Sequence, residues 1–179
     1  MSGKILHRKL GTSHILKPIG AVRVSQGPVL SRYLEQLTEC SGLQSVIIDL
    51  SDAESLDSTA LGFLAKIAIA THARFGFKPT LLFAHEDISR VLDSMGFHEI
   101  CVMLKGMAGA DSQMVELIAD QISEASLREQ VLDAHKTLMH LNAENEQRFC
   151  DLVGALESEV HKHLGPLQAK LVKSTMHPP

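Results

Sequence analysis

Residues 45–50 (SVIIDL) and 56–62 (LDSTALG) predict a buried β-strand that leads through a short loop into a helix. The first segment is apolar and rich in β-forming residues. In residues 58–75 the apolar residues recur every three or four positions, which is typical of a helix. Gly76 and Pro79 favour the end of that helix, and a second apolar strand follows at 80–84 (TLLFA). Two strands joined by one helix predict a parallel crossover. The helix positions on this spacing are Leu61, Leu64, Ala65, Ala68, Ile69 and His72.

The other segments up to residue 123 also alternate between strand and helix patterns. An alternation of this kind is typical of an α/β fold, so we expect one α/β domain over residues 1–123. The further strands are expected at residues 3–10, 13–19 and 100–104, and the further helices at 28–40, at 86–95 and from Ser112 onward.

Residues 124–164 form a second predicted unit, a long C-terminal helical extension, because the sequence becomes polar and rich in helix formers. Apolar residues recur there at heptad-like spacing, and Asn145 and Arg148 interrupt the stripe. The stripe suits three roles: packing on its own domain, a homodimer through this helix, or binding of a partner protein. We expect its first part to contact the domain and Phe149–Leu156 to serve another chain. The stripe consists of Val131, Leu138, Leu141, Phe149, Leu152 and Leu156.

A helix stop is expected at Gly165–Pro166, which leaves residues 165–179 as a flexible tail.

Composition narrows the function classes. The net charge of −4 gives no electrostatic reason to expect nucleic acid or an anionic membrane as partner. No apolar run approaches the ~20 residues of a membrane helix, and no export signal is recognisable. The three cysteines are far apart and fit a reducing cytoplasm better than a disulfide scaffold. A protein partner or a small ligand in the cytoplasm is therefore expected.

Asp57 and Ser58 lie where the predicted loop passes into the helix, beyond the carboxyl end of a parallel strand. Ligands and modifications are commonly found at this edge of open α/β sheets. Either side chain could also accept a hydrogen bond from the first turn of the helix as an N-cap. A capping role by itself would make both residues structural.

The segment from Asp49 to Gly62, taken with 76–82 and Met95-Gly96-Phe97, resembles the STAS family of sulfate-transporter and anti-sigma-antagonist domains. The family hallmark, Asp-Ser-Ser/Thr-Gly/Ala-Leu at the start of a helix, stands here as Asp57-Ser58-Thr59-Ala60-Leu61. The resemblance covers roughly residues 1–123 and implies a central mixed sheet flanked by helices. Two departures are Ala60 in place of the commoner glycine and the lack of an acidic residue within Gly20–Arg23.

The resemblance implies an anti-sigma factor antagonist, a protein without enzymatic activity or cofactor. In such proteins a partner kinase, often the anti-sigma factor itself, phosphorylates the serine at the position of Ser58. The implied partners are an anti-sigma factor and/or serine kinase, which binds the ATP, and an opposing phosphatase. Residues 57–61 would form the partner-binding surface. The alternative is a scaffold or sensor module that uses the same fold without phosphorylation.

The physical setting of Ser58 suits such a switch. A phosphoryl group adds about −1.5 to −2 charges, which a helix N-terminus tolerates. Asp52, Glu54 and Asp57 are nearby in the sequence, so we expect a negative patch that would repel a partner adapted to the unmodified surface.

Other functions fit the sequence less well. A hydrolase with Ser58 as nucleophile lacks the G-x-S-x-G turn, and its sequence neighbours include no histidine. A receiver domain would need paired acids after its first strand, although Lys105 follows the last strand. No glycine-rich phosphate loop is present. The ten histidines lack the spacing of a metal site: His135 and His140, and the pair in His161–His163, are not four residues apart.

Phosphorylation in the host is expected at Ser58 and not at Thr59, the second candidate beside it, because Ser58 matches the family acceptor position and should lie at an exposed helix start. Fragment mass spectra of the protein isolated from its host would locate the group. Modification confined to Thr59 would contradict the prediction, as would its absence under every growth condition.

Overall fold

The computed structural model describes residues 3–109 and 113–174, with side chains placed up to residue 162. A mixed seven-stranded sheet forms its centre in the order β6-β5-β3-β2-β1-β7, and β4 pairs with β2. β3, β5 and β6 continue from β2 in parallel, whereas β1 pairs antiparallel with β2 and β7. The strands are β1 (Lys4–Leu10), β2 (Ser13–Val22), β3 (Ser45–Asp49), β4 (Ala53–Leu56), β5 (Thr80–Phe83), β6 (Val102–Lys105) and β7 (Val115–Glu116).

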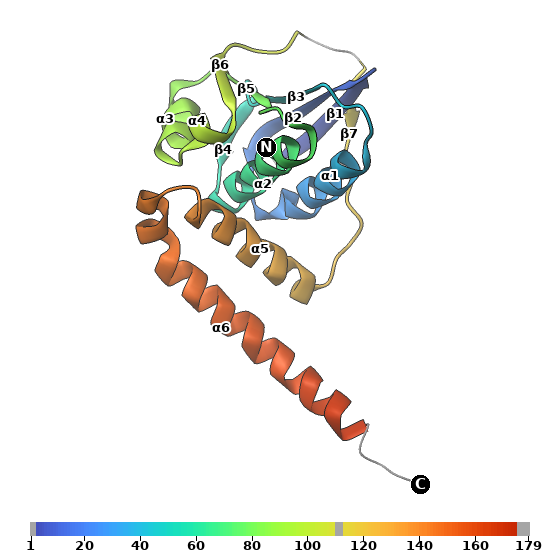
Figure 1. The fold of residues 1–179 in the computed structure, drawn as a ribbon, viewed down its shortest axis with the longest axis vertical. Helices are drawn as coiled ribbons and strands as arrows, with labels where there is room; N and C mark the ends of the chain where they lie inside the picture. The colour runs from blue at the N-terminus through green and yellow to red at the C-terminus, as the bar shows by residue number, and fades with distance from the viewer. Residues whose placement is uncertain (1–2, 110–112, 175–179) are drawn as a thin grey trace.

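Helices α1 and α2 lie side by side on one face of the sheet, and α3 and α4 lie near β5 and β6 (Figure 1). The predicted crossover from β3 through α2 to β5 is confirmed, as is the mixed sheet flanked by helices. The helices are η1 (Val24–Gln26), α1 (Gly27–Glu39), α2 (Ser58–Phe75), α3 (Glu86–Ser94), α4 (Phe97–Ile100), α5 (Glu124–Met139) and α6 (Ala143–Ser174).

The helix expected from Ser112 onward is wrong over its described part. Ser112 lies outside the described residues, and Val115–Glu116 form the short strand β7 beside β1. The edge of β1 offers free backbone groups, and the N–H of Leu117 donates to the carbonyl of Ile5 at 2.8 Å. Edge pairing therefore decides this segment over its helical spacing.

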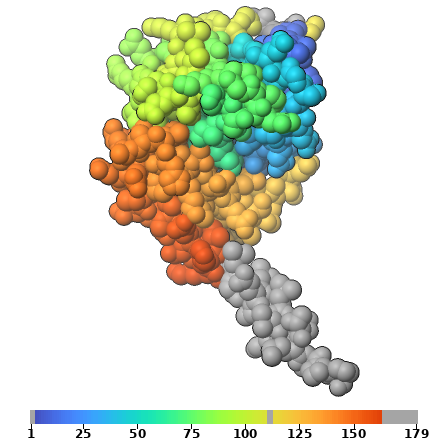
Figure 2. Space-filling model, viewed as in Figure 1, coloured from blue at the N-terminus to red at the C-terminus, as the bar shows by residue number. Residues whose placement is uncertain are grey.

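The C-terminal extension folds back on itself and does not form one continuous helix. α5 and α6 pack together as a hairpin, which lies below the sheet domain in Figure 1 and whose described side chains form the orange surface in Figure 2. Asn145, fully buried, donates through its side chain to the carbonyl of Leu138 at 2.9 Å and to that of Met95 at 3.0 Å. The Oδ1 of Asn142 accepts from the backbone N–H of Asn145 at 2.8 Å and so caps the start of α6. The polar interruption of the stripe therefore marks the turn of the hairpin.

The expectation that Phe149–Leu156 serve another chain is wrong for Phe149 and stays a prediction for Leu152 and Leu156. Phe149 and Val153 are buried within the protein's own chain, whereas Leu152 is 41% exposed. The reason is the fold-back, which places the first turns of α6 against α5.

None of the helices in the described ranges combines the length and the hydropathy that a membrane-spanning segment requires.

The helix stop expected at Gly165–Pro166 is also wrong, because α6 continues to Ser174. Proline removes one backbone hydrogen bond, but strong helix formers in 167–173 continue the helix on its far side. Residues 175–179 of the predicted tail lie outside the described residues.

α2 is enclosed on several sides, since the sheet, α1 and α5 all pack near it. Its residues from Thr59 to Leu64 are all buried, as are most of the residues up to Thr71. A helix that is apolar nearly all round needs such a surrounding. The fold of the domain and the position of the extension are therefore linked through α2.

Replacing Asn145 with alanine should lower the free energy of unfolding by about 1–3 kcal/mol, because two carbonyls lose their donor and a small cavity forms. Urea denaturation would measure the loss. The control Gln147→Ala, at an exposed position of the same helix, should change stability by no more than ~0.5 kcal/mol. Equal stability of the two variants would contradict the role of Asn145 in the turn.

Candidate functional site

Asp57 is the N-cap of α2. Its Oδ1 accepts from the N–H of Ala60 at 2.8 Å, and its Oδ2 accepts from the N–H of Val24 at 2.9 Å. Its own N–H donates to the carbonyl of Val22 at 3.1 Å. Asp57 therefore joins the start of α2 to the end of β2, and of the two candidates for the cap it is the one used.

Ser58 occupies the first position of α2, and its hydroxyl takes no part in the cap. The Oγ lies 2.9 Å from Nε2 of His135 on α5, a residue 77 positions away. Nδ1 of His135 lies 2.8 Å from the carbonyl of Val131, which can only accept, so Nδ1 carries the proton. In the neutral ring Nε2 is then the acceptor, and the hydroxyl of Ser58 donates to it.

Ser58 is half-buried, so the exposed helix start expected from the sequence is wrong. The cause is α5, whose His135 is only 4% exposed and stacks edge-on against Phe149 of α6, with 6.0 Å between ring centroids. The rest of the motif lies deeper still. Thr59 is 6% exposed, and Ala60 and Leu61 are buried in the core.

Gly62 allows α5 to come close to α2. A Cβ at this position would lie 2.4 Å from the carbonyl oxygen of Ala134 and 2.8 Å from its Cβ. One turn further along α2, Lys66 forms an ion pair with Asp133. A glycine inside a helix costs about 1 kcal/mol relative to alanine, and it commonly marks such a close approach. A glycine at position 62 therefore indicates in the sequence that another helix packs closely against α2, but it does not indicate that this helix is α5.

The serine and histidine pair is not by itself a catalytic site. A hydrolytic triad would place a carboxylate on Nδ1 of the histidine, whereas His135 is oriented by a backbone carbonyl. The arrangement holds the hydroxyl in place.

The negative patch expected around Ser58 is partly compensated. Lys17 pairs with Asp52 at 2.7 Å and with the fully buried Asp49 at 3.2 Å. Burial lowers the pKa of Lys17, but the hydrogen bonds to the two carboxylates outweigh this and raise it above its usual value. Asp57 accepts hydrogen bonds from two backbone N–H groups. Glu54, the third acid of the expected patch, is exposed, and no hydrogen bond or ion pair of its side chain is found among the described residues.

The mixed sheet flanked by helices, with a capped Asp-Ser pair at the start of α2, defines the class of the protein as an α/β domain. A sequence profile of the STAS domain matches residues 7–110, more than half of the chain. The chain belongs to the STAS domain family.

The fold is also similar to that in a crystal structure of an anti-sigma factor antagonist from Mycobacterium paratuberculosis. The two chains are 19% identical, with a TM-score of 0.47, and the match covers 57% of this chain and 85% of the other. That likeness is too distant to transfer a function. A search of curated protein sequences finds no significant match.

A second polar group lies between β1, β2 and α1. The rings of His7 and His14 are 5.1 Å apart, and that of Tyr33 is 5.2 Å from His7. Burial, with contributions from His14 and Lys9, lowers the pKa of His7 to about 4. No group of three or more metal-ligating residues suited to an ion occurs within the described part of the chain. The cluster therefore keeps neutral imidazoles inside the fold.

The protein should lose stability as the pH falls from 6.5 to about 4, because the unfolded chain takes up a proton at His7 and the folded chain does not. The contribution of His7 is complete above its unfolded pKa and is lost on approach to the folded one. Urea denaturation across this range should show a smaller decrease for His7→Gln than for His98→Gln, an exposed control. Equal slopes for the two variants would contradict the assignment.

Proposed function

We propose that this protein is an anti-sigma factor antagonist that acts by phosphorylation-dependent partner switching at Ser58. The observation that carries the proposal is that only one of the two residues at the start of α2 is used as its cap. Asp57 caps the helix, and the hydroxyl of Ser58 is not needed for the cap. A phosphoryl group on Ser58 would therefore leave the cap intact and lie at the positive end of the helix dipole. Thr59 is the weaker candidate because it is buried.

The proposed cycle has two states. The unmodified chain binds and sequesters an anti-sigma factor. A serine kinase, either that factor or a separate protein, transfers the γ-phosphoryl group of its bound ATP to Oγ of Ser58, releasing ADP and the hydroxyl proton. The added charge then disfavours the complex. A phosphatase hydrolyses the phosphoserine with water, which restores the hydroxyl and releases inorganic phosphate. The chain itself performs no catalysis and binds no cofactor, nucleic acid or membrane, and the cycle takes place in the bacterial cytoplasm.

A scaffold or sensor module that works without phosphorylation is the second candidate. The hydrogen bond between Ser58 and His135 favours it, because it holds the hydroxyl beneath α5 in the resting chain. The two candidates differ in whether a charge at Ser58 changes the partner.

Affinity capture from host lysate with Ser58→Asp and Ser58→Ala as baits separates them. The aspartate should reduce recovery of the partner about tenfold, equivalent to ~1.4 kcal/mol of binding free energy, while alanine should retain it. Ser55→Asp is the matched control, because it adds the same charge at an exposed position three residues earlier. Equal recovery with both aspartate variants would contradict the switch and favour the scaffold.

A further inference from the structure

We propose that the hairpin of α5 and α6 is an internal competitor that occupies the partner surface of α2 and must move away before a partner can reach Ser58. The inference rests on the proposed function, since it takes Ser58 as the centre of the partner surface. It adds that the protein's own α5–α6 hairpin occupies this surface, and it names the contacts that hold the hairpin there.

The contact follows one face of α2. Ser58, Gly62 and Lys66 are spaced four residues apart and so lie on the same side of the helix. They meet His135, Ala134 and Asp133 of α5 respectively, through a hydrogen bond, a close backbone approach and an ion pair. Three successive turns of α2 are thus covered by consecutive residues of one crossing helix.

The contact with α5 would prevent a kinase from phosphorylating Ser58. The attacking oxygen must approach the γ-phosphorus in line, within about 3–3.5 Å, inside the active site of the kinase. The Oγ of Ser58 instead donates to His135, which is almost completely buried. The covered form is therefore closed to a kinase, and a partner binds only the fraction of molecules that is open.

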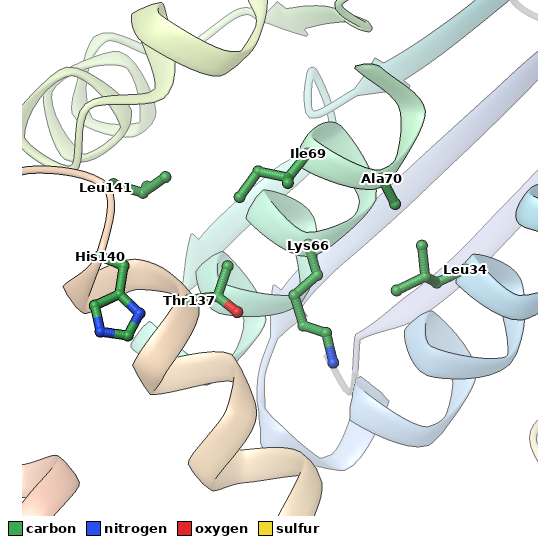
Figure 3. Close-up of a pocket in the computed structure, with 7 residues that line it drawn as sticks. All are labelled: Leu34, Lys66, Ile69, Ala70, Thr137, His140 and Leu141. Atoms are coloured by element: carbon green, nitrogen blue, oxygen red, sulfur yellow. The ribbon is translucent and has the colours of Figure 1, made fainter. Parts of the chain in front are cut away.

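The seam between α2 and α5 is incompletely packed beyond Lys66. An open cavity of about 400 Å³ lies there, and Figure 3 shows its lining side chains arranged around the gap between α1, α2 and α5. Ile69 on its α2 side is 41% exposed. Contacts missing along a seam weaken the attraction across it, so this end favours separation of α5. The cavity is lined by Leu34, Lys66, Ile69, Ala70, Thr137, His140 and Leu141.

The same contacts describe what a competing partner would meet. On the uncovered face it would find the hydroxyl donor of Ser58, the cation of Lys66 and, between them, a glycine that admits close approach of a helix. A partner helix with a small residue at its centre, an acceptor on one side and a carboxylate on the other would fit where α5 lies.

Gly62→Ala weakens the contact between α2 and α5 at a position other than residue 58. The added methyl group would collide with the backbone of Ala134, whereas alanine favours the α2 helix itself by about 1 kcal/mol. Gly154→Ala on α6 is the matched control, because a Cβ there meets nothing within 4 Å. Asp133→Lys is a second opening variant, since it places a cation opposite Lys66 from the solvent side, and Glu129→Lys is its exposed control.

Accessibility at position 58 can be measured in the full chain without any kinase, as the labelling rate of the thiol introduced by Ser58→Cys. Cys40 and Cys150 are first replaced by serine. Burial raises the pKa of Cys101 to about 12, so its thiol remains unreactive near neutral pH. Labelling should become about tenfold faster with Gly62→Ala or Asp133→Lys and remain unchanged with the two controls. Hydrogen exchange should accelerate in 124–139 and stay slow in the sheet.

Unchanged labelling in both opening variants would overturn the proposal, as would accelerated exchange throughout the sheet, since α5 would then be an inseparable part of the core. Phosphorylation of Ser58 in host extract with ATP, compared between Gly62→Ala and Gly154→Ala, tests the switch separately. Faster modification of the opened chain supports both ideas. If labelling responds but Ser58 is never modified, the cover stands and the proposed phosphorylation fails.

Discussion

The close contact between α2 and α5, made possible by Gly62, is the interaction that determines where the extension lies and what surrounds Ser58. α2 is apolar on almost every side, and the sheet and α1 cover only part of it. α5 supplies the remaining cover, with the backbone of Ala134 lying where a side chain on Gly62 would be. Because burial of apolar surface is the main stabilising contribution, the helix of the STAS motif and the C-terminal extension stabilise each other.

The same contact determines the state of the candidate switch residue. Asp57 secures the start of α2 through three hydrogen bonds, so a change at Ser58 need not disturb the cap. The hydroxyl of Ser58 is then free to bond to a residue of the extension, and His135 receives it. The capping role of Asp57 and the proposed switching role of Ser58 thus belong to adjacent residues, and the extension contacts the second one.

The hairpin also explains how heptad-like spacing can mislead. The pattern from Val131 to Leu156 identified apolar residues, and the interruption at Asn145 and Arg148 indicated a break. Spacing describes one helix and carries no information about which neighbour covers it. The two carbonyls to which Asn145 donates, those of Leu138 and Met95, belong to segments that meet only after the chain folds back. The polar residue is there because of that meeting.

The sequence by itself determined the crossover from β3 through α2 to β5, the cap position at the start of α2, the STAS resemblance and Ser58 as the candidate for modification. Those features depend on residues within a few turns of one another, where periodicity and capping act. Only the tertiary structure decided that β7 pairs with β1, that the extension folds into a hairpin and that His135 lies on Ser58. These depend on which distant surfaces bury one another, and this is decided by packing across the whole chain and not by any local pattern.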